Sequence, residues 1–415
     1  MQQKVIADRV GQRDAGAAAS FDVRPSQRAM GVRYAIRDIV VLAEQAKAAG
    51  KELLNLNIGD PLLYDFQTPR HIIEATYQAM LSGHNGYASS AGVPEALEAI
   101  RSEAVRLGYH NIQDIFTTSG VSEGIEVATA ALLDASENLL IPAPGYPLYE
   151  ATLAKLGFEA IYYHLDESNG WQPDVDQIAR LINSRTRGIA VLNPNNPTGA
   201  IIPRETLKAI LDLAAHHGLV VISDEIYSKL VFEPDAYVPM ATLSPEQPVL
   251  TFNGMSKAYL VPGFRIGWGI LTGQQHHVSE YREAIAKMLR VRLCASHPAQ
   301  FAIKPALEGD QSHIPVVVEK LRRRRDVVMS VLNSYSKIHC FQPQAAFYAF
   351  PRLEISRPDN EFVADLIRQT GVIVVPGTGF GQPPGTKHFR LVFLPPEDIL
   401  RKATHLIGDF AGRWQ

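Results

Sequence analysis

Short, apolar, β-branched runs that alternate with helical stretches are the feature that most limits the folds open to this sequence. Seven such runs occur between residues 114 and 271: DIFTTSG, NLLIPAP, EAIYYHL, GIAVLNP, LVVISD, VLTFNG and RIGWGIL. Strands that are apolar on both faces are typical of a mostly parallel sheet covered by helices on both sides. We therefore expect an α/β fold whose ligand lies at the carboxyl ends of the strands.

The pattern changes after a helical region at roughly 276–335. The runs that follow are KIHCFQP, AFYAFPRL, VIVVPG and HFRLVFL, interleaved with expected helices at 360–370 and 396–412. This pattern predicts a second, smaller α+β domain. The predicted organisation is a flexible arm at 1–28, an N-terminal segment at 29–60 that packs with the small domain, a large domain at 61–310 and a small domain at 311–415. Within the N-terminal segment, an amphipathic helix is expected from about residue 34, with Gly50 at its C-cap.

Charge and cysteine usage exclude several classes of protein. The 40 Lys and Arg residues against 43 Asp and Glu residues give a net charge of −3, so neither nucleic acid nor another polyanion is expected as a partner. The basic run KLRRRRDVV at 320–328 is predicted to be a solvated helix face. Cys294 and Cys340 are the only cysteines and lie far apart, which predicts no disulfide, no metal site and a cytoplasmic location. No apolar run is long enough for a membrane span.

Three side chains near strand ends suggest covalent chemistry. Lys257 lies in TFNGMSKAYLVPGFRIGW, where it is either a solvated loop lysine or a lysine that forms an imine with a carbonyl cofactor. Asp224 ends LVVISD, and a buried acid there either caps a helix or holds a cation such as a protonated pyridine nitrogen. Tyr227 either packs in the core or donates to the phenolate oxygen of the same ring.

Three further segments could bind other parts of such a cofactor. Asn196 lies in the proline-stiffened VLNPNNPTGA, which is either a rigid loop or a loop that aims this amide at the phenolate oxygen. In TTSGVSEGIEVA the N–H groups of Val121 and Ser122 open a helix and suit a phosphate, although a capping box from Ser119 or Ser122 explains the segment equally well. Tyr146 in PAPGYPLY could stack on a planar ring.

In this order, these pieces resemble the class I/II aminotransferases of fold type I, which use pyridoxal 5′-phosphate. The resemblance extends from about residue 34 to the C-terminus, and its most specific stretches are NPNNPTG, SDEIY and SKAYLVPGFRIGW. It implies a large cofactor-binding domain with a mostly parallel seven-stranded sheet, and a smaller α+β domain.

The resemblance implies roles for matching residues. Lys257 would carry the cofactor as an imine, Arg265 would grip its phosphate, and Ser256 matches the serine just before the lysine. Tyr87 of YASSAG matches a tyrosine that reaches the phosphate of the neighbouring subunit, which implies a homodimer with shared active sites. Many relatives also have a phosphate-binding serine where this chain has Gly254.

Substrate-binding residues follow from the same resemblance. Arg390 of HFRLVF matches the arginine that clamps the substrate α-carboxylate, although a surface arginine beside a strand is the alternative. Gly59 of LNIGDP and Asn196 would lie at the same carboxylate. RYAIRDIVVLAEQA resembles the alanine aminotransferase group at Tyr34 and Arg37, but the two residues after Arg37 differ from the Gly-Pro of that group, and an exposed helix arginine is equally compatible.

The implied reaction moves an amino group between an L-amino acid and a 2-oxo acid. The favoured version converts L-alanine and 2-oxoglutarate to pyruvate and L-glutamate. The alternatives are an aspartate, aromatic or branched-chain aminotransferase, and more distantly a lyase or racemase on the same fold, because these enzymes differ mainly in side-pocket groups.

Overall fold

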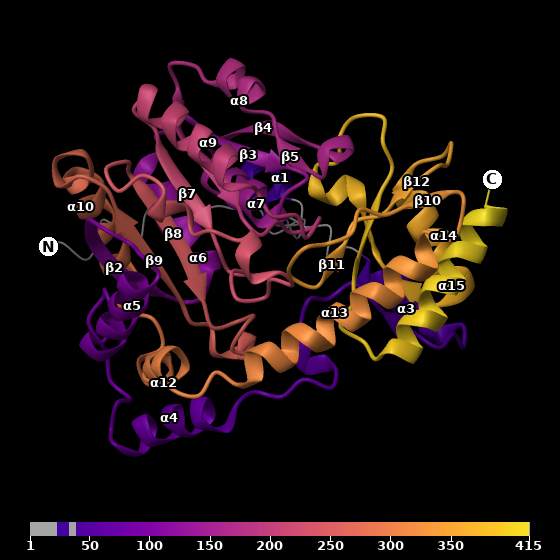
Figure 1. Ribbon diagram of the computed structural model, residues 1–415, viewed down its shortest axis with the longest axis horizontal. Helices are drawn as coiled ribbons and strands as arrows, with labels where there is room; N and C mark the ends of the chain where they lie inside the picture. Colours follow the sequence, from indigo (N-terminus) through magenta and orange to yellow (C-terminus); the bar gives the residue numbers. More distant parts are fainter. Residues whose placement is uncertain (1–22, 33–38, 415) are drawn as a thin grey trace, which may run out of the picture.

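A large mixed sheet organises the first three quarters of the chain. The computed structural model describes residues 23–32 and 39–414, and Figure 1 shows the sheet, whose strand order is β2-β9-β8-β7-β6-β3-β4-β5. The strands are β2 (Ile112–Thr118), β3 (Asn138–Ala143), β4 (Glu159–Asp166), β5 (Gln172–Pro173), β6 (Thr186–Leu192), β7 (Val220–Asp224), β8 (Val249–Gly254) and β9 (Gly267–Thr272). Strands β4, β3, β6, β7 and β8 are parallel, whereas β9 is antiparallel to both of its neighbours. The mostly parallel sheet is confirmed: the seven predicted runs are strands, and β5 is an additional two-residue strand at the edge.

Helices cover both faces of this sheet because successive residues of each strand point to opposite sides. Ile189 and Val191 of β6 pack in one apolar cluster, whereas Ala190 and Leu192 pack in the other. On the first face lie α5 (Pro94–Arg106), α8 (Val175–Leu181), α9 (Arg204–His216) and α12 (Ile303–Glu308); on the second lie α6 (Val121–Leu132), α7 (Pro147–Leu156) and α10 (Gln275–Val291). Strand β6 is therefore apolar on both sides, as the sequence predicts.

The C-terminal quarter forms a separate group of helices and short strands, to the right of the sheet in Figure 1. Its helices are α13 (His313–Leu332), α14 (Asp359–Thr370) and α15 (Glu397–Arg413), and its strands are β10 (Ile338–His339), β11 (Tyr348–Ala349), β12 (Arg352–Leu353), β13 (Val372–Ile373), β14 (Val375–Pro376) and β15 (Phe389–Val392). Strand β15 lies between β11 and β14 and pairs antiparallel with both. The N-terminal strand β1 (Leu54–Asn55) pairs with β13, so residues distant in sequence meet there.

The α-helices not yet named pack mainly against other helices. They are α1 (Gln27–Gly31), α3 (Val40–Ala48), α4 (Arg70–Leu81) and α11 (His297–Gln300). Gly50 follows α3 with φ +80 and its N–H donates to the Lys47 carbonyl oxygen at 2.9 Å, which confirms the predicted helix end. The start of that predicted helix, and most of the predicted arm, lie outside the described residues. No helix of the described ranges is both long and apolar enough to span a membrane.

The basic run on α13 differs from the prediction. Arg324 is 3% and Arg325 is 8% exposed, so a fully solvated helix face is wrong for these two. The Arg324 guanidinium pairs with Asp65, and the Arg325 guanidinium pairs with Asp326. A buried guanidinium is stable only with such partners. Arg322 and Arg323 form ion pairs with Glu319 and Glu397, respectively. The run therefore does not present a free basic patch.

Candidate active site

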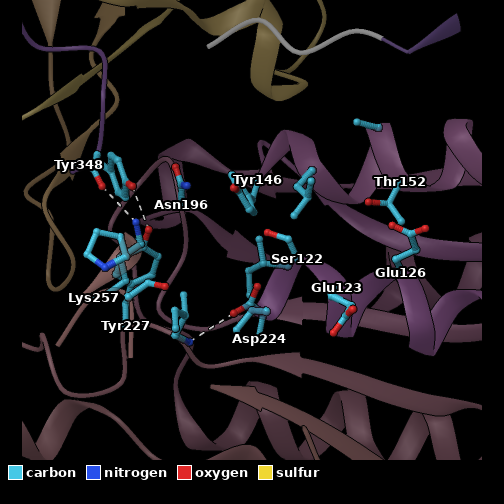
Figure 2. Close-up of a pocket in the computed structure, with 18 of the residues that line it drawn as sticks. Ser122, Glu123, Glu126, Tyr146, Thr152, Asn196, Asp224, Tyr227, Lys257 and Tyr348 are labelled. Atoms are coloured by element: carbon cyan, nitrogen blue, oxygen red, sulfur yellow. Dashed lines mark hydrogen bonds between the residues drawn. The ribbon is translucent and has the colours of Figure 1, made fainter. Parts of the chain in front are cut away.

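A cavity of about 1230 Å³ opens where several strands and helices of the large sheet end, beside the C-terminal quarter. The sequence-predicted residues that line it are Gly59, Val121, Ser122, Tyr146, Asn196, Asp224, Tyr227, Ser256, Lys257, Arg265 and Arg390. Figure 2 shows that the labelled members of this set point into one space from different segments. The structure therefore gathers residues that are up to 331 positions apart in the sequence, from Gly59 to Arg390.

Asp224 ends β7 at the floor of this cavity and is 5% exposed. Its carboxylate accepts hydrogen bonds from the Ile226 N–H at 3.3 Å and from the Tyr149 hydroxyl at 3.4 Å. Burial raises the pKa of Asp224 to about 6, although these bonds oppose the increase. A turn follows Asp224 instead of a helix, so the helix-cap alternative is wrong. This arrangement suits a cationic ligand atom, which would compensate for the loss of water around the carboxylate.

Lys257 follows β8, and its side chain lies in the cavity instead of in open solvent (Figure 2). Its Nζ donates to the Gly59 carbonyl oxygen at 3.1 Å and lies 5.9 Å from the Tyr227 ring centroid. Among the described residues, no carboxylate lies within 4.0 Å of this ammonium group. The alternative of a solvated loop lysine is therefore wrong, and Nζ is placed to react with a molecule in the cavity.

The start of α6 has the geometry that an anion site needs. Gly120 is the N-cap with φ +79, and the helix has no side-chain cap, so neither Ser119 nor Ser122 closes a full capping box. The hydrogen bond that is present runs from the backbone to the glutamate: the Ser119 N–H donates to the Glu123 carboxylate at 2.7 Å. The guanidinium of Arg265 lies against Gly120, where an added Cβ would come within 2.3 Å of Nη2. Free N–H groups and a guanidinium at one point suit a phosphate.

Arg390 lies on the opposite side of the cavity, in β15, and is 1% exposed. Its Nη1 donates to the Asn196 side-chain oxygen at 3.5 Å and its Nη2 donates to the Asn57 carbonyl oxygen. The guanidinium carbon lies 4.7 Å from the Tyr348 ring centroid and 4.8 Å from that of Phe380. The surface-arginine alternative is wrong. A fixed, buried guanidinium on the wall of a cavity suits a carboxylate ligand.

Tyr348 is a cavity residue that the sequence analysis missed. Its hydroxyl lies 2.9 Å from the Tyr227 hydroxyl. A Cβ at Gly59 would come within 2.4 Å of the same Tyr348 oxygen, so only glycine fits at position 59 without a shift of Tyr348. The sequence signal for Tyr348 is weak because an aromatic residue in an apolar strand usually belongs to the core.

One predicted residue that the structure describes does not reach the cavity, and two others cannot be placed. Tyr87 is 82% exposed and does not line it. Tyr34 and Arg37 lie outside the described residues. Gly254, where many aminotransferases have a serine, has no space for a side chain because an added Cβ would come within 2.9 Å of the Ile266 carbonyl oxygen.

The residues present fit pyridoxal 5′-phosphate. The uncapped start of α6 with Arg265 suits the phosphate, Asp224 suits the protonated ring nitrogen, and Lys257 suits the aldehyde carbon. The cavity volume of about 1230 Å³ leaves room for a substrate beside the cofactor.

Comparisons with known proteins agree with this geometry. The family model described as aminotransferase class I and II matches residues 51–406. The chain is 38% identical to alanine aminotransferase of Mycobacterium tuberculosis over 93% of this chain and 92% of that protein. It is 37% identical to glutamate-pyruvate aminotransferase AlaA of Escherichia coli over 94% and 98% of the two chains. The solved structure of an alanine aminotransferase from Pyrococcus furiosus matches with a TM-score of 0.90 and 39% identity, over 94% of this chain and 100% of the other.

Proposed function

The chain belongs to the class I and II aminotransferases, which use pyridoxal 5′-phosphate, and on that premise we propose that it transfers the amino group of L-alanine to 2-oxoglutarate. The products are pyruvate and L-glutamate. The observation that carries this choice of substrates is the similarity, over more than nine tenths of the chain, to two enzymes named for alanine or for glutamate and pyruvate.

Binding and orientation of the cofactor fall to three groups of this chain. Lys257 would bond the cofactor covalently, Asp224 would pair with its ring nitrogen, and the start of α6 with Arg265 would hold its phosphate. When bound, the cofactor supplies an electron-withdrawing ring that stabilises the negative charge left at Cα after proton loss. Asp224 supports this chemistry because its buried carboxylate favours a cationic ring nitrogen.

Substrate orientation falls to the opposite wall of the cavity. The planar guanidinium of Arg390 can hold both oxygens of an α-carboxylate, and Asn196 lies within 3.5 Å of it. A substrate fixed there presents its Cα toward the lysine side of the cavity. Lys257 would be the amine that accepts the Cα proton, because its Nζ lies in the same cavity and forms no ion pair with a carboxylate of the described residues.

We also propose that the enzyme is a homodimer that works in the cytoplasm. The α4 residues Ile73, Tyr77 and Leu81 are large, apolar and exposed, and Tyr87 just beyond them is 82% exposed. Such a cluster is typical of a surface that another subunit covers. A second copy packed there would allow Tyr87 to reach the neighbouring active site. Both cysteines are unbridged, which is compatible with a reducing compartment.

The test is a panel of amino donors offered one at a time to the cofactor-loaded enzyme. L-alanine alone and L-glutamate alone should each convert the bound cofactor to its amine form and release the matching 2-oxo acid. Preference for L-aspartate with oxaloacetate would favour the aspartate aminotransferase alternative. Release of ammonia in place of a stored amino group would show a lyase.

A further inference from the structure

Tyr348 contacts three groups that the proposed function uses, although it belongs to neither the lysine segment nor the asparagine loop. Its hydroxyl lies 2.9 Å from the Tyr227 hydroxyl, its ring lies 4.7 Å from the Arg390 guanidinium carbon, and its oxygen occupies the space beside Gly59. Figure 2 shows Tyr348 and Tyr227 joined at the Lys257 end of the cavity. One side chain therefore links the side of the cavity that would hold the cofactor with the side that would hold the substrate carboxylate.

We propose that Tyr348 is a positioning residue: its hydroxyl donates to Tyr227 so that Tyr227 can donate to the ring oxygen of the cofactor, and its ring supports Arg390. This inference rests on the proposed cofactor site and adds to it a residue that the sequence did not indicate. The two parts of the side chain have separable tasks, because the hydroxyl faces one partner and the ring faces the other.

The direction of the hydrogen bond follows from the donors available. A tyrosine hydroxyl has one proton to donate, and if Tyr227 gives its proton to the ring oxygen, its own oxygen is left to accept. The Tyr348 hydroxyl at 2.9 Å is then the donor. Hydrogen bonds in such a chain polarise one another, so the first bond strengthens the second.

Other titratable groups lie near the Tyr227 and Tyr348 hydroxyls, but Tyr348 has the hydroxyl that can donate to Tyr227. Burial raises the pKa of Tyr227 well above its usual range, and the neighbouring groups Tyr348, Tyr146 and Asp224 add to the increase. Lys257 Nζ lies 5.9 Å from the Tyr227 ring centroid. Tyr227 therefore keeps its proton at neutral pH and can donate it.

A weaker donation from Tyr227 has a measurable consequence. The nitrogen that joins Lys257 to the cofactor can carry a proton beside the negatively charged ring oxygen, and loss of this proton changes the visible absorbance. A donor to the ring oxygen disperses its negative charge and makes the proton easier to lose. Weakening this donor should therefore move the midpoint of the absorbance change to higher pH.

The experiment titrates the visible absorbance of cofactor-loaded wild type, Tyr348→Phe, Tyr227→Phe and the double variant. Tyr348→Phe should move the midpoint upward by on the order of 0.5 pH unit, less than Tyr227→Phe does. In the Tyr227→Phe background, Tyr348→Phe should add no further shift. An unchanged midpoint in Tyr348→Phe would overturn the proposal. It would also be overturned if the midpoint shift of the double variant equalled the sum of the shifts of the two single variants.

Two further variants separate the hydroxyl from the ring. Tyr348→Phe keeps the ring beneath Arg390 and should change KM for L-alanine less than about twofold, whereas Tyr348→Leu should raise it about threefold or more. Equal KM values for the two variants would overturn the role of the ring. Tyr281→Phe removes a hydroxyl that bonds the Ala128 carbonyl oxygen outside the cavity, so it should leave the midpoint unchanged. Absence of visible absorbance from wild type itself would overturn the proposed cofactor site, a result distinct from an unchanged midpoint in Tyr348→Phe.

Discussion

Asp224 is a residue whose surroundings make its carboxyl group easier to protonate than that of an exposed aspartate. The carboxyl is 5% exposed, and burial is the largest cause of its raised pKa of about 6. In the cofactor-free protein, the ionised form is therefore disfavoured relative to the unfolded chain, where the value is 3.8. A protonated ring nitrogen would reverse this balance, so cofactor binding and the charge of Asp224 are linked.

The sign of this linkage predicts how stability depends on pH. Because the folded pKa is raised, the contribution of this group to the stability of cofactor-free protein is fully present below pH 3.8 and is lost as the pH rises through about 6. Asp224→Asn has no carboxyl group to ionise at this position, so it should not lose this stability as the pH rises. The difference in free energy of unfolding between Asp224→Asn and wild type, both cofactor-free, should grow between about pH 4 and pH 6.5 and then level off at no more than about 3 kcal/mol, and the difference in Tm should follow it.

The cofactor-loaded proteins give the matching control. Addition of pyridoxal 5′-phosphate at pH 8 should raise the Tm of wild type more than that of Asp224→Asn, because only the carboxylate can pair with the ring nitrogen. A Tm difference that does not change with pH, together with equal stabilisation by the cofactor, would contradict this account of Asp224.

Local sequence predicts residues in this site only where a motif surrounds them. Lys257, Asp224 and Asn196 lie in motifs that end strands, so their types and positions pointed to chemistry. Tyr348 lies in a two-residue strand of the C-terminal quarter, and its contact with Tyr227 joins residues 121 positions apart. No local pattern encodes such a contact. Arg390 was likewise indicated only by resemblance, since its burial depends on packing between distant segments.

At the scale of elements, the start of α6 shows how backbone shape and ligand binding depend on one residue. Gly120 has φ +79 and its missing Cβ leaves the space that the Arg265 guanidinium fills. Gly120→Ala should cost about 1 kcal/mol of stability through the backbone. It should also displace Arg265 and weaken cofactor binding about tenfold or more, measured by equilibrium dialysis.

Gly218 provides a matched control for this prediction. It has φ +64 and an added Cβ would meet nothing within 4 Å. Gly218→Ala should therefore show a similar loss of stability without a change in cofactor affinity. Equal affinities for the two variants would mean that the space at Gly120 is not needed for the phosphate.

The sequence predicts a helix or strand correctly where the residues of that element alone show its pattern. Strands β3 and β7 are buried along their whole length, which gives the continuous apolar runs seen in the sequence. Strand β5 has two residues and exists only through its pairing with β4, so no periodicity marks it. The expected long helical region near 276–335 is broken into four helices; Leu293 has φ 71 and Gly309 ends α12.

For the whole molecule, we expect a dimer held by the exposed apolar face of α4. Tyr77→Asp places a charge in that face, so sedimentation should show a shift toward monomer. If Tyr87 completes the neighbouring site, the monomer should also bind the cofactor phosphate more weakly. Val41→Asp is the control, because Val41 is also exposed and belongs to α3, which Figure 1 shows at the right of the molecule whereas α4 lies at the lower left. A wild-type monomer, or a Tyr77→Asp dimer of unchanged strength, would contradict this interface.

The central claim is that Lys257 carries the cofactor within the cavity that Asp224 and Arg390 line. The most direct measurement is the visible absorption spectrum of purified wild type and Lys257→Ala, each incubated with pyridoxal 5′-phosphate and then freed of unbound cofactor. Wild type should retain a visible band that L-alanine abolishes, whereas Lys257→Ala should show neither a lysine-linked band nor turnover. A Lys257→Ala protein that keeps the wild-type spectrum and activity would contradict the account.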